Sequence, residues 1–384
     1  MADVSTHHRA EYESAPEIIV SAPGTVNLMG AHTEESEGMV LSVALNRRMY
    51  VAVSRRKDQS LRFFAGDLSE RKRATISGVK YKREDRWANL PKGVIVQLLE
   101  RGTVMPGLNV TISGTVPSGI GLASSAAVSG AVITALDTLL ELELTHQQQV
   151  AIAVAAERDF MNRAVGRSEC ITALRAEADC AMQIDGRSGE YAAVGLDLAG
   201  IKLLVTDSKV PISPARSEYE ERLADCLTCV DVLQERRPGR ALRDFTLEDL
   251  DEAMGRIPES TRRRCLHVIR ENQRVVEMVN ALRRRDWHSA GRLLTRSHAS
   301  LRDLYEVSCP EIDWLVKRAV ETDGVLGARI TGNGFGGCAV ALVEEGAVNA
   351  YYERLDEYER IFGFHPEAFV CDASVGARVE EEIA

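Results

Sequence analysis

A glycine- and serine-rich segment, Pro117–Ala127 (PSGIGLASSAA), has the residue types expected of a loop that binds a polyphosphate. It follows a strand-like run, Leu108–Ile112, and precedes small apolar residues that predict a helix from Ser124 to about Leu140. Glycines let a backbone approach a ligand closely, and a helix that begins after the loop points unpaired N–H groups at it. The hydroxyl groups of Ser124 and Ser125 can bind Mg²⁺ or a phosphate oxygen. A Gly/Ser turn that caps a buried helix remains the alternative.

A second glycine cluster, Gly332–Gly337 (GNGFGG), satisfies the G-x-G-x-x-G expression of dinucleotide-binding proteins. In that fold the glycines open a helix, whereas Cys338–Val343 (CAVALV) has the composition of a strand. We therefore predict a strand–loop–strand hairpin, which either approaches a ligand or simply turns the chain. The chain contains no G-x-x-x-x-G-K-[ST] segment, so it is not a P-loop enzyme.

Short apolar and β-branched runs bounded by Gly, Ser and Asp predict the strands that position these loops. Before residue 207 they are Ile18–Ser21, Met39–Leu45, Met49–Val53, Leu61–Phe64, Leu108–Ile112, Tyr191–Leu196 and Ile201–Thr206, with a further helix at Ala151–Phe160. Val210–Ser217 has the composition of a linker, and a largely helical stretch follows it to about Glu321. The chain then returns to strand, glycine loop and strand, with a helix at Gly346–Phe362 and a strand near Phe369. The pattern predicts an α+β chain in two lobes, residues 1–206 and 207–384.

The composition limits the classes of partner. The 384 residues are enough for two lobes, and 45% hydrophobic with 27% charged residues is ordinary for a folded protein. Forty-seven Lys and Arg against 57 Asp and Glu give a formal net charge of −10. Such a chain has no general attraction to nucleic acid or to an anionic membrane surface. We therefore expect no nucleic-acid partner and no membrane partner.

The chain shows no pattern typical of secretion or membrane insertion. Its N-terminal MADVSTHHRAEYES lacks an apolar core, and polar residues interrupt its longest apolar stretch, Ala126–Leu140. Eight scattered cysteines favour free thiols over a disulfide framework. Cys226 and Cys229 form a C-x-x-C inside a helical pattern with no second pair, so one helix face explains them better than zinc or redox chemistry. These features predict a cytoplasmic protein.

Three segments in order resemble the galactokinase branch of the small-molecule GHMP kinases. Ala22–Gly38 (APGTVNLMGAHTEESEG) is similar to the family text APGRVNLIGEHTDYNGG. Pro117–Ala127 is close to PxxxGLSSSA, and Gly327–Cys338 (GARITGNGFGGC) is close to GARMTGAGFGGC. Trp87–Asn89 resembles the family segment near the adenine pocket. The likeness runs from about residue 17 to residue 375.

The resemblance implies a two-lobed GHMP kinase fold, with an N-terminal lobe like domain 2 of ribosomal protein S5 and a ferredoxin-like C-terminal lobe. It also implies ATP and Mg²⁺ as cofactors, and phosphoryl transfer to a sugar hydroxyl, usually the anomeric one. Glu157 matches the carboxylate of the family's AExxF, which holds Mg²⁺ together with a loop serine such as Ser124 or Ser125; a surface glutamate is the alternative. We expect a monomer or weak dimer. The residues implied to bind the nucleotide are Trp87, Pro117, Gly119, Gly121, Leu122, Ser124, Ser125 and Ala126.

The positions that carry the chemistry depart from the family. Glu169 stands twelve residues after Glu157, where galactokinases carry a catalytic aspartate, and it can still accept or orient a hydroxyl proton. Its extra methylene displaces the carboxylate by roughly 1 Å, a shift that costs on the order of 100-fold if uncompensated. The family arginine after A-P-G is Thr25, and such a charge is worth about 10³–10⁵ in related chemistry. Arg167 is a candidate replacement, although an exposed loop arginine is the alternative.

The segment that would bind the sugar is also altered, from E-H-x-D-Y to Ala31–Glu35 (AHTEE). His32 is retained and Glu34 replaces the aspartate, but Ala31 lacks the carboxylate that reads a distal hydroxyl. Galacturonokinase-like sequences also show G-A-H, yet the charge of Glu34, Glu35 and Glu37 would repel a uronic acid. A larger, deoxygenated or amino sugar suits this loop better than galactose.

The leading hypothesis is therefore an ATP- and Mg²⁺-dependent sugar kinase that acts on a sugar other than galactose. Glu169 would be the base, and His32, Glu34 and Tyr219 would contact the sugar. The first alternative is a catalytically silent nucleotide- or sugar-binding regulator, which the replacement at Thr25 favours. The second is a GHMP kinase of a non-sugar metabolite, such as an isoprenoid alcohol or an amino acid. It ranks third because the motifs lie nearer to galactokinase.

Overall fold

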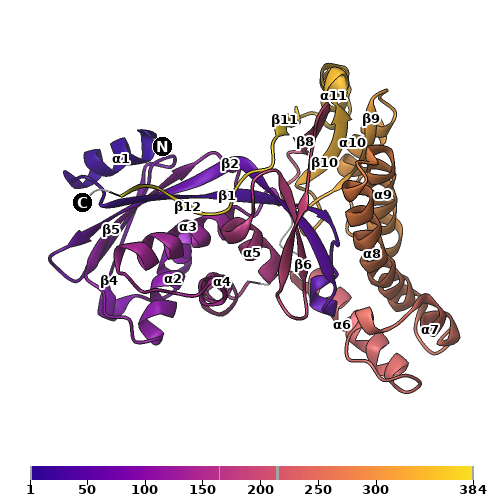
Figure 1. Ribbon diagram of the computed structural model, residues 1–384, viewed down its shortest axis with the longest axis horizontal. Coiled ribbons are helices and arrows are strands. Elements are labelled where there is room, and N and C mark those ends of the chain that lie inside the picture. Colours follow the sequence, from indigo (N-terminus) through magenta and orange to yellow (C-terminus); the bar gives the residue numbers. More distant parts are fainter. Residues whose placement is uncertain (1, 164, 213–215, 383–384) are drawn as a thin grey trace.

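The computed structural model describes residues 2–163, 165–212 and 216–382, and it has two lobes, each built on a β-sheet (Figure 1). No helix in the described ranges is long and apolar enough to cross a membrane. The active-site loops predicted from the sequence lie where the two lobes meet, so the fold is described here from the first sheet toward that junction.

The first sheet has the order β12-β1-β2-β5-β3-β4, and β6 and β7 extend it beside the start of β2. Among the strand pairs that the described residues form, only β3 and β5 run parallel to each other. Most of β1 is buried, because helices cover one face and the second lobe covers its far end. The strands are β1 (Ile18–Met29), β2 (Met39–Arg56), β3 (Ser60–Ala65), β4 (Glu70–Thr75), β5 (Gly107–Gly114), β6 (Cys180–Asp185), β7 (Tyr191–Gly195) and β12 (Arg378–Glu382).

Four helices cover one face of this sheet, namely α2 (Asn89–Glu100), α3 (Ser124–Leu139), α4 (His146–Ala155) and α5 (Arg167–Arg175) (Figure 1). The small side chains of Ala126, Ala127 and Ala131 are fully buried, which lets α3 pack closely on β1 and β2. On the opposite face lies α1 (Ala2–Tyr12), a helix that the sequence analysis did not predict. Its buried side chains are Val4 and His8, and His8 hydrogen-bonds Thr111 and Ser54 in the sheet.

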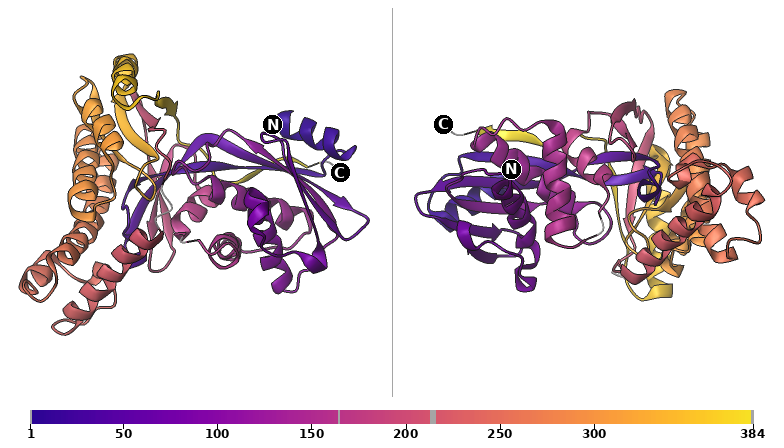
Figure 2. Two further views of the ribbon diagram at one scale, coloured as in Figure 1. Left: turned by 180° about the vertical axis from the view of Figure 1, so that it is seen from behind. Right: turned by 90° about the horizontal axis from the view of Figure 1, so that it is seen from below.

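The second sheet is fully antiparallel, with the order β11-β8-β10-β9. Its strands are β8 (Ile201–Asp207), β9 (Val325–Ile330), β10 (Cys338–Glu344) and β11 (Glu367–Cys371). The hairpin predicted around the second glycine cluster is confirmed, because β9 and β10 pair on either side of it. The long helices α8 and α9 stand at the end of the molecule opposite the two described chain ends (Figures 1 and 2). The helices of this lobe are α6 (Arg216–Gln234), α7 (Leu247–Glu252), α8 (Glu259–Arg283), α9 (Trp287–Ser300), α10 (Pro310–Val320) and α11 (Val348–Phe362).

The two sheets do not divide the chain at one point. β8, which the sequence analysis placed in the first lobe, belongs to the second sheet, and β12 returns from the second lobe to pair with β1. The pairing of Ile18 with Glu382 joins residues at opposite ends of the chain, and the charged sequence of β12 gave no strand signal. The proposed division at residues 206 and 207 therefore describes the bulk of each lobe and leaves out β8 and β12.

One predicted gap between strands is absent from the structure. The sequence analysis placed two strands at Met39–Leu45 and Met49–Val53, whereas β2 runs unbroken through the polar residues between them. Arg48 is buried there, and its guanidinium donates hydrogen bonds to the carbonyl groups of Val375 and Gly376 at 2.7 Å each. The C-terminal segment therefore packs over the polar residues of β2 between the two predicted strands, whose sequence alone is typical of a turn. The predicted linker lies partly outside the described residues, at 213–215. All eight cysteines are free thiols.

Candidate functional site

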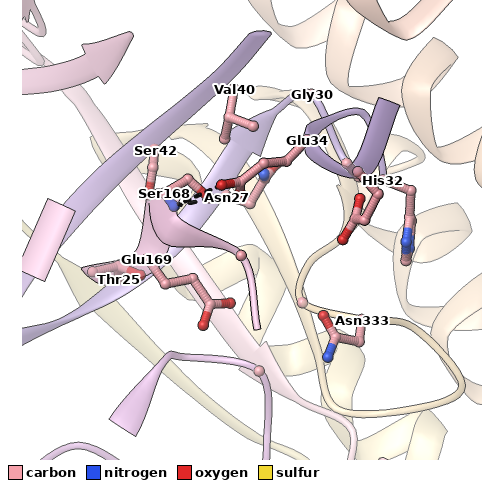
Figure 3. Close-up of a pocket in the computed structure, with 15 residues that line it drawn as sticks. Thr25, Asn27, Gly30, His32, Glu34, Val40, Ser42, Ser168, Glu169 and Asn333 are labelled. Atoms are coloured by element: carbon pink, nitrogen blue, oxygen red, sulfur yellow. Dashed lines mark hydrogen bonds between the residues drawn. The ribbon is translucent and has the colours of Figure 1, made fainter. Parts of the chain in front are cut away.

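Two cavities meet at the first glycine loop. The larger, of about 690 Å³, extends from the turn that carries Trp87 to the start of α3. The smaller, of about 60 Å³, lies between β1, the start of α5 and the second glycine loop (Figure 3). Gly119 lines the larger cavity and Gly121 lines the smaller one. A single loop therefore borders both cavities, and only Ile120 stands between Gly119 and Gly121.

The backbone of this loop requires glycine. Gly121 has a φ of +86°, and a Cβ atom there would lie 3.2 Å from the Cα atom of Gly332. The two glycine loops, one from each lobe, are thus packed backbone against backbone. A Cβ atom at Gly119 would meet no atom within 4 Å, which leaves its backbone open toward the larger cavity.

The residues predicted to bind nucleotide fall into three groups. Trp87, Gly119, Ser124 and Ser125 line the larger cavity. Leu122 and Ala126 are buried in the hydrophobic core, and Pro117 is not part of the described lining of either cavity. In a tight turn successive side chains point in different directions, so these three can meet a ligand only through their main chain. Gly121 faces the acceptor side instead.

Glu157 is a buried carboxylate with one unpartnered oxygen atom. It lies in a π-helical turn that continues α4, a local irregularity that is frequent at functional sites. Its side chain is 2% exposed, and Oε1 has no hydrogen-bond partner among the described residues. Burial raises the pKa of Glu157 to about 7, against the opposing effects of Arg163 and the Ser125 hydroxyl. Mg²⁺ prefers such hard oxygen ligands, and of the two serines that the sequence analysis named, Ser125 is the one whose hydroxyl interacts with Glu157.

Glu169 lies in the first turn of α5 and lines the smaller cavity. Figure 3 shows its carboxyl group projecting into the space that Asn333 also lines. Burial raises the pKa of Glu169 to about 8, and the negative charges of Glu157, Glu34 and Glu35 act in the same direction. No Lys or Arg is among the described residues that line this cavity, and Thr25, 2% exposed, occupies its wall. The structure therefore places Glu169 in the lining of the cavity, and its catalytic role stays a prediction.

Glu34 holds the start of α5. Its carboxylate accepts hydrogen bonds from the main-chain N–H groups of Arg167 at 2.7 Å and Ser168 at 3.1 Å, and from the Ser168 hydroxyl at 2.5 Å. A Cβ atom at Gly166 would lie 2.3 Å from Glu34 Oε2, so a side chain at this position would displace the Glu34 carboxylate from α5. Glu34, which was predicted to contact the sugar, is therefore already hydrogen-bonded to the start of α5. Through these bonds it positions Glu169, which lies in the same helical turn.

The suggestion that Arg167 replaces the missing arginine is wrong. The Arg167 side chain lies against Gly189, where a Cβ atom would be 2.9 Å from its Nη1 atom. It lines a third cavity, of about 620 Å³, that also contains His146 and Tyr219. Only the main-chain N–H of Arg167 serves the site, through Glu34. The guanidinium points away because the first turn of α5 places residue 167 on the opposite side from residue 169.

His32 lines the smaller cavity, as predicted, whereas Tyr219 does not. The His32 ring packs on Tyr305 with centroids 4.6 Å apart, and its Nε2 atom is buried with no partner among the described residues. Burial lowers the pKa of His32 to about 4, so the imidazole is neutral at physiological pH. Tyr219 faces the third cavity, and its hydroxyl donates a hydrogen bond to Glu35. Tyr219 therefore stabilises the loop that carries His32 and Glu35 from the side of the third cavity.

A buried charged group in the second lobe fixes the loop that carries Ala31. Glu271 of α8 accepts hydrogen bonds from the N–H groups of Gly30 at 3.1 Å and Ala31 at 3.3 Å. It also pairs with Arg274 at 2.6 Å, and Arg329 Nη1 lies 3.6 Å away. These cations lower the pKa of Glu271 to about 2, despite its burial. Nothing in the spacing of the sequence signalled this network, because its members are far apart along the chain.

The sequence analysis missed several residues that line the smaller cavity. Asn27 Oδ1 is buried with no partner among the described residues, so it is free to accept a hydrogen bond from a ligand. Asn333 stands at the tip of the second glycine loop, where the family text quoted above has alanine. That departure was a signal that could have identified Asn333. Ser42 and Ser168 also line the cavity, and no motif marked them.

Comparisons with known proteins agree with this geometry. Three family models match the chain: "Galactokinase galactose-binding signature" at residues 6–55, "GHMP kinases N terminal domain" at 89–176 and "GHMP kinases C terminal" at 278–360. A galactokinase of Roseiflexus sp. is 38% identical over 95% of this chain and 93% of its own. The human galactokinase is 35% identical over 99% of this chain and 96% of its own. The crystal structure of Lactococcus lactis galactokinase with galactose superposes with a TM-score of 0.93 at 28% identity, covering 98% of this chain and 99% of that one.

Proposed function

The chain belongs to the galactokinase family of GHMP sugar kinases, and from that premise we propose that it catalyses the ATP- and Mg²⁺-dependent phosphorylation of a sugar other than galactose. The hydroxyl phosphorylated is the anomeric one. One observation carries the proposal: the same glycine loop borders a nucleotide-sized cavity and a small cavity that contains Glu169. A phosphoryl group held by that loop would lie beside an acceptor in the small cavity.

The nucleotide side has the groups that a phosphate chain and its metal need. Main-chain N–H groups at the start of α3 point unpaired toward the loop, and Ser124 and Ser125 add hydroxyl groups. Ser125 and Glu157, whose Oε1 atom has no partner among the described residues, would hold Mg²⁺, which when bound would neutralise charge on the transferring phosphoryl group. Trp87 forms part of the opposite end of the cavity, where an adenine ring fits.

On the acceptor side Glu169 orients the sugar hydroxyl and takes its proton. The hydroxyl oxygen forms a bond to the γ-phosphorus of ATP, the bond to the β–γ bridging oxygen breaks, and ADP leaves. Glu169 must lose its own proton first, because burial keeps its pKa at about 8. His32 and Asn27 contribute unpartnered polar atoms that suit sugar hydroxyl groups. The start of α5, fixed by Glu34, keeps the base in place.

Three features support a sugar other than galactose. Ala31 lines the acceptor cavity without a polar side chain, whereas the family text has glutamate at this position. Glu271 fixes the main chain of Ala31, so the loop keeps its position although it lacks that carboxylate. The third cavity shares Glu34, Glu35 and Gly166 with the acceptor cavity, which leaves room beyond this wall for an added substituent. The described lining of the acceptor cavity has carboxyl groups and no Lys or Arg to pair with a substrate carboxylate, which favours a neutral or amino sugar over a uronic acid.

The test is sugar-dependent ADP release with Mg²⁺ across galactose, galactosamine, 2-deoxygalactose, galacturonate and a higher-carbon sugar. We expect turnover with an amino, deoxy or larger sugar at a kcat/KM above that for galactose, and none with galacturonate. Glu169→Gln, which keeps the size of the side chain, should abolish the turnover while ATP still binds. A preference for galactose would refute the substrate proposal and leave the kinase proposal intact.

A catalytically silent regulator is the second candidate, and one observation favours it. Thr25 leaves the acceptor cavity without a cation among its described lining residues, and Glu169 is largely protonated at neutral pH. In that case calorimetry would show ATP binding, and no sugar would release ADP above the rate of Glu169→Gln. A non-sugar substrate has less support, because the galactokinase-specific family model matches residues 6–55.

A further inference from the structure

One arginine borders the phosphate end of the nucleotide cavity with no ion pair of its own. Arg163 lies in the segment between the π-helical turn and α5, and its main-chain N–H donates a hydrogen bond to the Glu157 carbonyl at 3.1 Å. Its side chain lines the larger cavity together with Ser118, Gly119, Ser124 and Ser125. The guanidinium is exposed, and it makes no ion pair or side-chain hydrogen bond with the residues that the structure describes.

We propose that Arg163 binds the phosphate chain of the nucleotide and supplies the positive charge that the acceptor cavity lacks. This inference rests on the proposed kinase function and adds a catalytic residue to it. A guanidinium forms paired, charge-assisted hydrogen bonds to phosphate oxygens, and it remains charged at every working pH. Phosphoryl transfer depends mostly on positioning and on neutralised charge, so an arginine on the nucleotide side can act where one on the acceptor side is missing.

Arg163 is also linked directly to the residue proposed to hold the metal, because its main-chain N–H donates a hydrogen bond to the Glu157 carbonyl at 3.1 Å. Other arginines are placed differently. Arg83 and Arg86 line the same cavity at its Trp87 end, and Arg86 pairs with Glu70 at 3.1 Å. Arg167 lies in the third cavity. Among the described arginines that line the larger cavity, Arg163 is the one whose main chain is hydrogen-bonded to Glu157.

The first experiment measures binding without turnover. Isothermal calorimetry with Mg²⁺ compares a non-hydrolysable ATP analogue with adenosine, for the wild type, Arg163→Gln, Arg163→Lys and the control Arg62→Gln. Arg62 is an exposed arginine of the same lobe that lines none of the three cavities described above. We expect Arg163→Gln to weaken binding of the ATP analogue about 10-fold, as the loss of one charge-assisted contact predicts, and to leave the affinity for adenosine unchanged. The affinity of Arg163→Lys for the analogue should lie between those of the wild type and Arg163→Gln, because lysine keeps the charge and loses the paired hydrogen bonds of the guanidinium.

The second experiment measures turnover with the sugar that the panel identifies. Arg163→Gln should lower kcat by about 100-fold, the cost of removing one preorganised charge contact. Adding Thr25→Arg to Arg163→Gln should restore part of the rate, since either position would supply the same charge. If Arg163→Gln matches Arg62→Gln in both affinity and kcat, Arg163 is a solvated surface arginine and the inference fails. If the wild type turns over no sugar, the kinase proposal fails, and the calorimetry alone decides the role of Arg163.

Discussion

At the scale of single residues, the acceptor cavity is distinguished by the absence of a Lys or Arg beside Glu169 among its described lining residues. Glu169 is half-buried in the cavity wall, three other carboxyl groups are near enough to raise its pKa further, and Thr25 stands where the resembled family carries an arginine. The count from Glu157 singled out Glu169, which the structure places in the lining of this cavity. The count did not give the direction of the Arg167 side chain, because that direction depends on where α5 begins, and the sequence analysis did not predict this helix.

The pH dependence of turnover should report this pKa. Glu169 acts as a base only when ionised, and its pKa is raised to about 8, so kcat/KM should increase with pH and level off above about 8. Steady-state kinetics from pH 6 to 9 in the wild type measure it, with ATP binding at each pH as the control. A profile that is already flat at pH 6 would contradict the assigned role.

Restoring the arginine should move that profile. In Thr25→Arg a cation beside Glu169 favours its ionised form, so its pKa should fall and the rising limb of kcat/KM should shift to lower pH by about one unit or more. Thr25→Lys serves as a second cation, and Thr25→Val as an uncharged change of matched size. An unchanged profile in both cationic variants, with the fold retained by circular dichroism, would show that residue 25 does not face Glu169.

At the scale of elements, the site depends on how α5 begins. The sequence predicted the loop before α3 and the hairpin of β9 and β10, because glycine patterns and strand composition are local signals. It did not predict α1, whose residues are mostly polar, or β12, whose pairing spans the whole chain. Glu34 was expected to contact sugar, yet it caps α5, since only the folded chain brings residue 34 to residue 167.

Removing this cap should impair catalysis more than nucleotide binding. In Glu34→Ala the N–H groups of Arg167 and Ser168 lose their acceptor, which should cost about 1 kcal/mol of stability. A freed first turn would displace Glu169, and a shift of about 1 Å can lower kcat on the order of 100-fold. Chemical denaturation, kcat and calorimetry of ATP measure the three effects. Equal losses of ATP affinity and kcat would indicate general damage instead.

At the scale of the whole molecule, Glu271 ties one lobe to the other. It lies on α8 of the second lobe, accepts hydrogen bonds from Gly30 and Ala31 of the first, and pairs with Arg274. A buried carboxylate with cationic partners keeps its charge, which accounts for its lowered pKa. The acceptor loop is thus held by a residue more than two hundred positions away, a relation that no local pattern in the sequence reveals.

Acid should weaken this tie, and its removal should destabilise the fold. The folded-state pKa of Glu271 is about 2 against an ordinary 4.5, so its contribution is complete above pH 4.5 and is lost as the pH falls toward 2. Glu271→Gln leaves the cations beside it unpaired and should cost about 3–5 kcal/mol in the free energy of unfolding. Urea unfolding at pH 7 and pH 4 measures both. The variant should lose stability less steeply on acidification than the wild type, and equal slopes would contradict the assignment.

The return of β12 to the first sheet also sets an order of assembly during synthesis. The ribosome delivers β1 early and β12 only after the whole second lobe, so for most of translation one edge of β1 has no strand to pair with. The residues that cover Arg48 arrive equally late. A nascent chain of this protein must therefore hold its first lobe incomplete while the second forms, and the exposed edge of β1 is the surface that a ribosome-associated chaperone would have to shield.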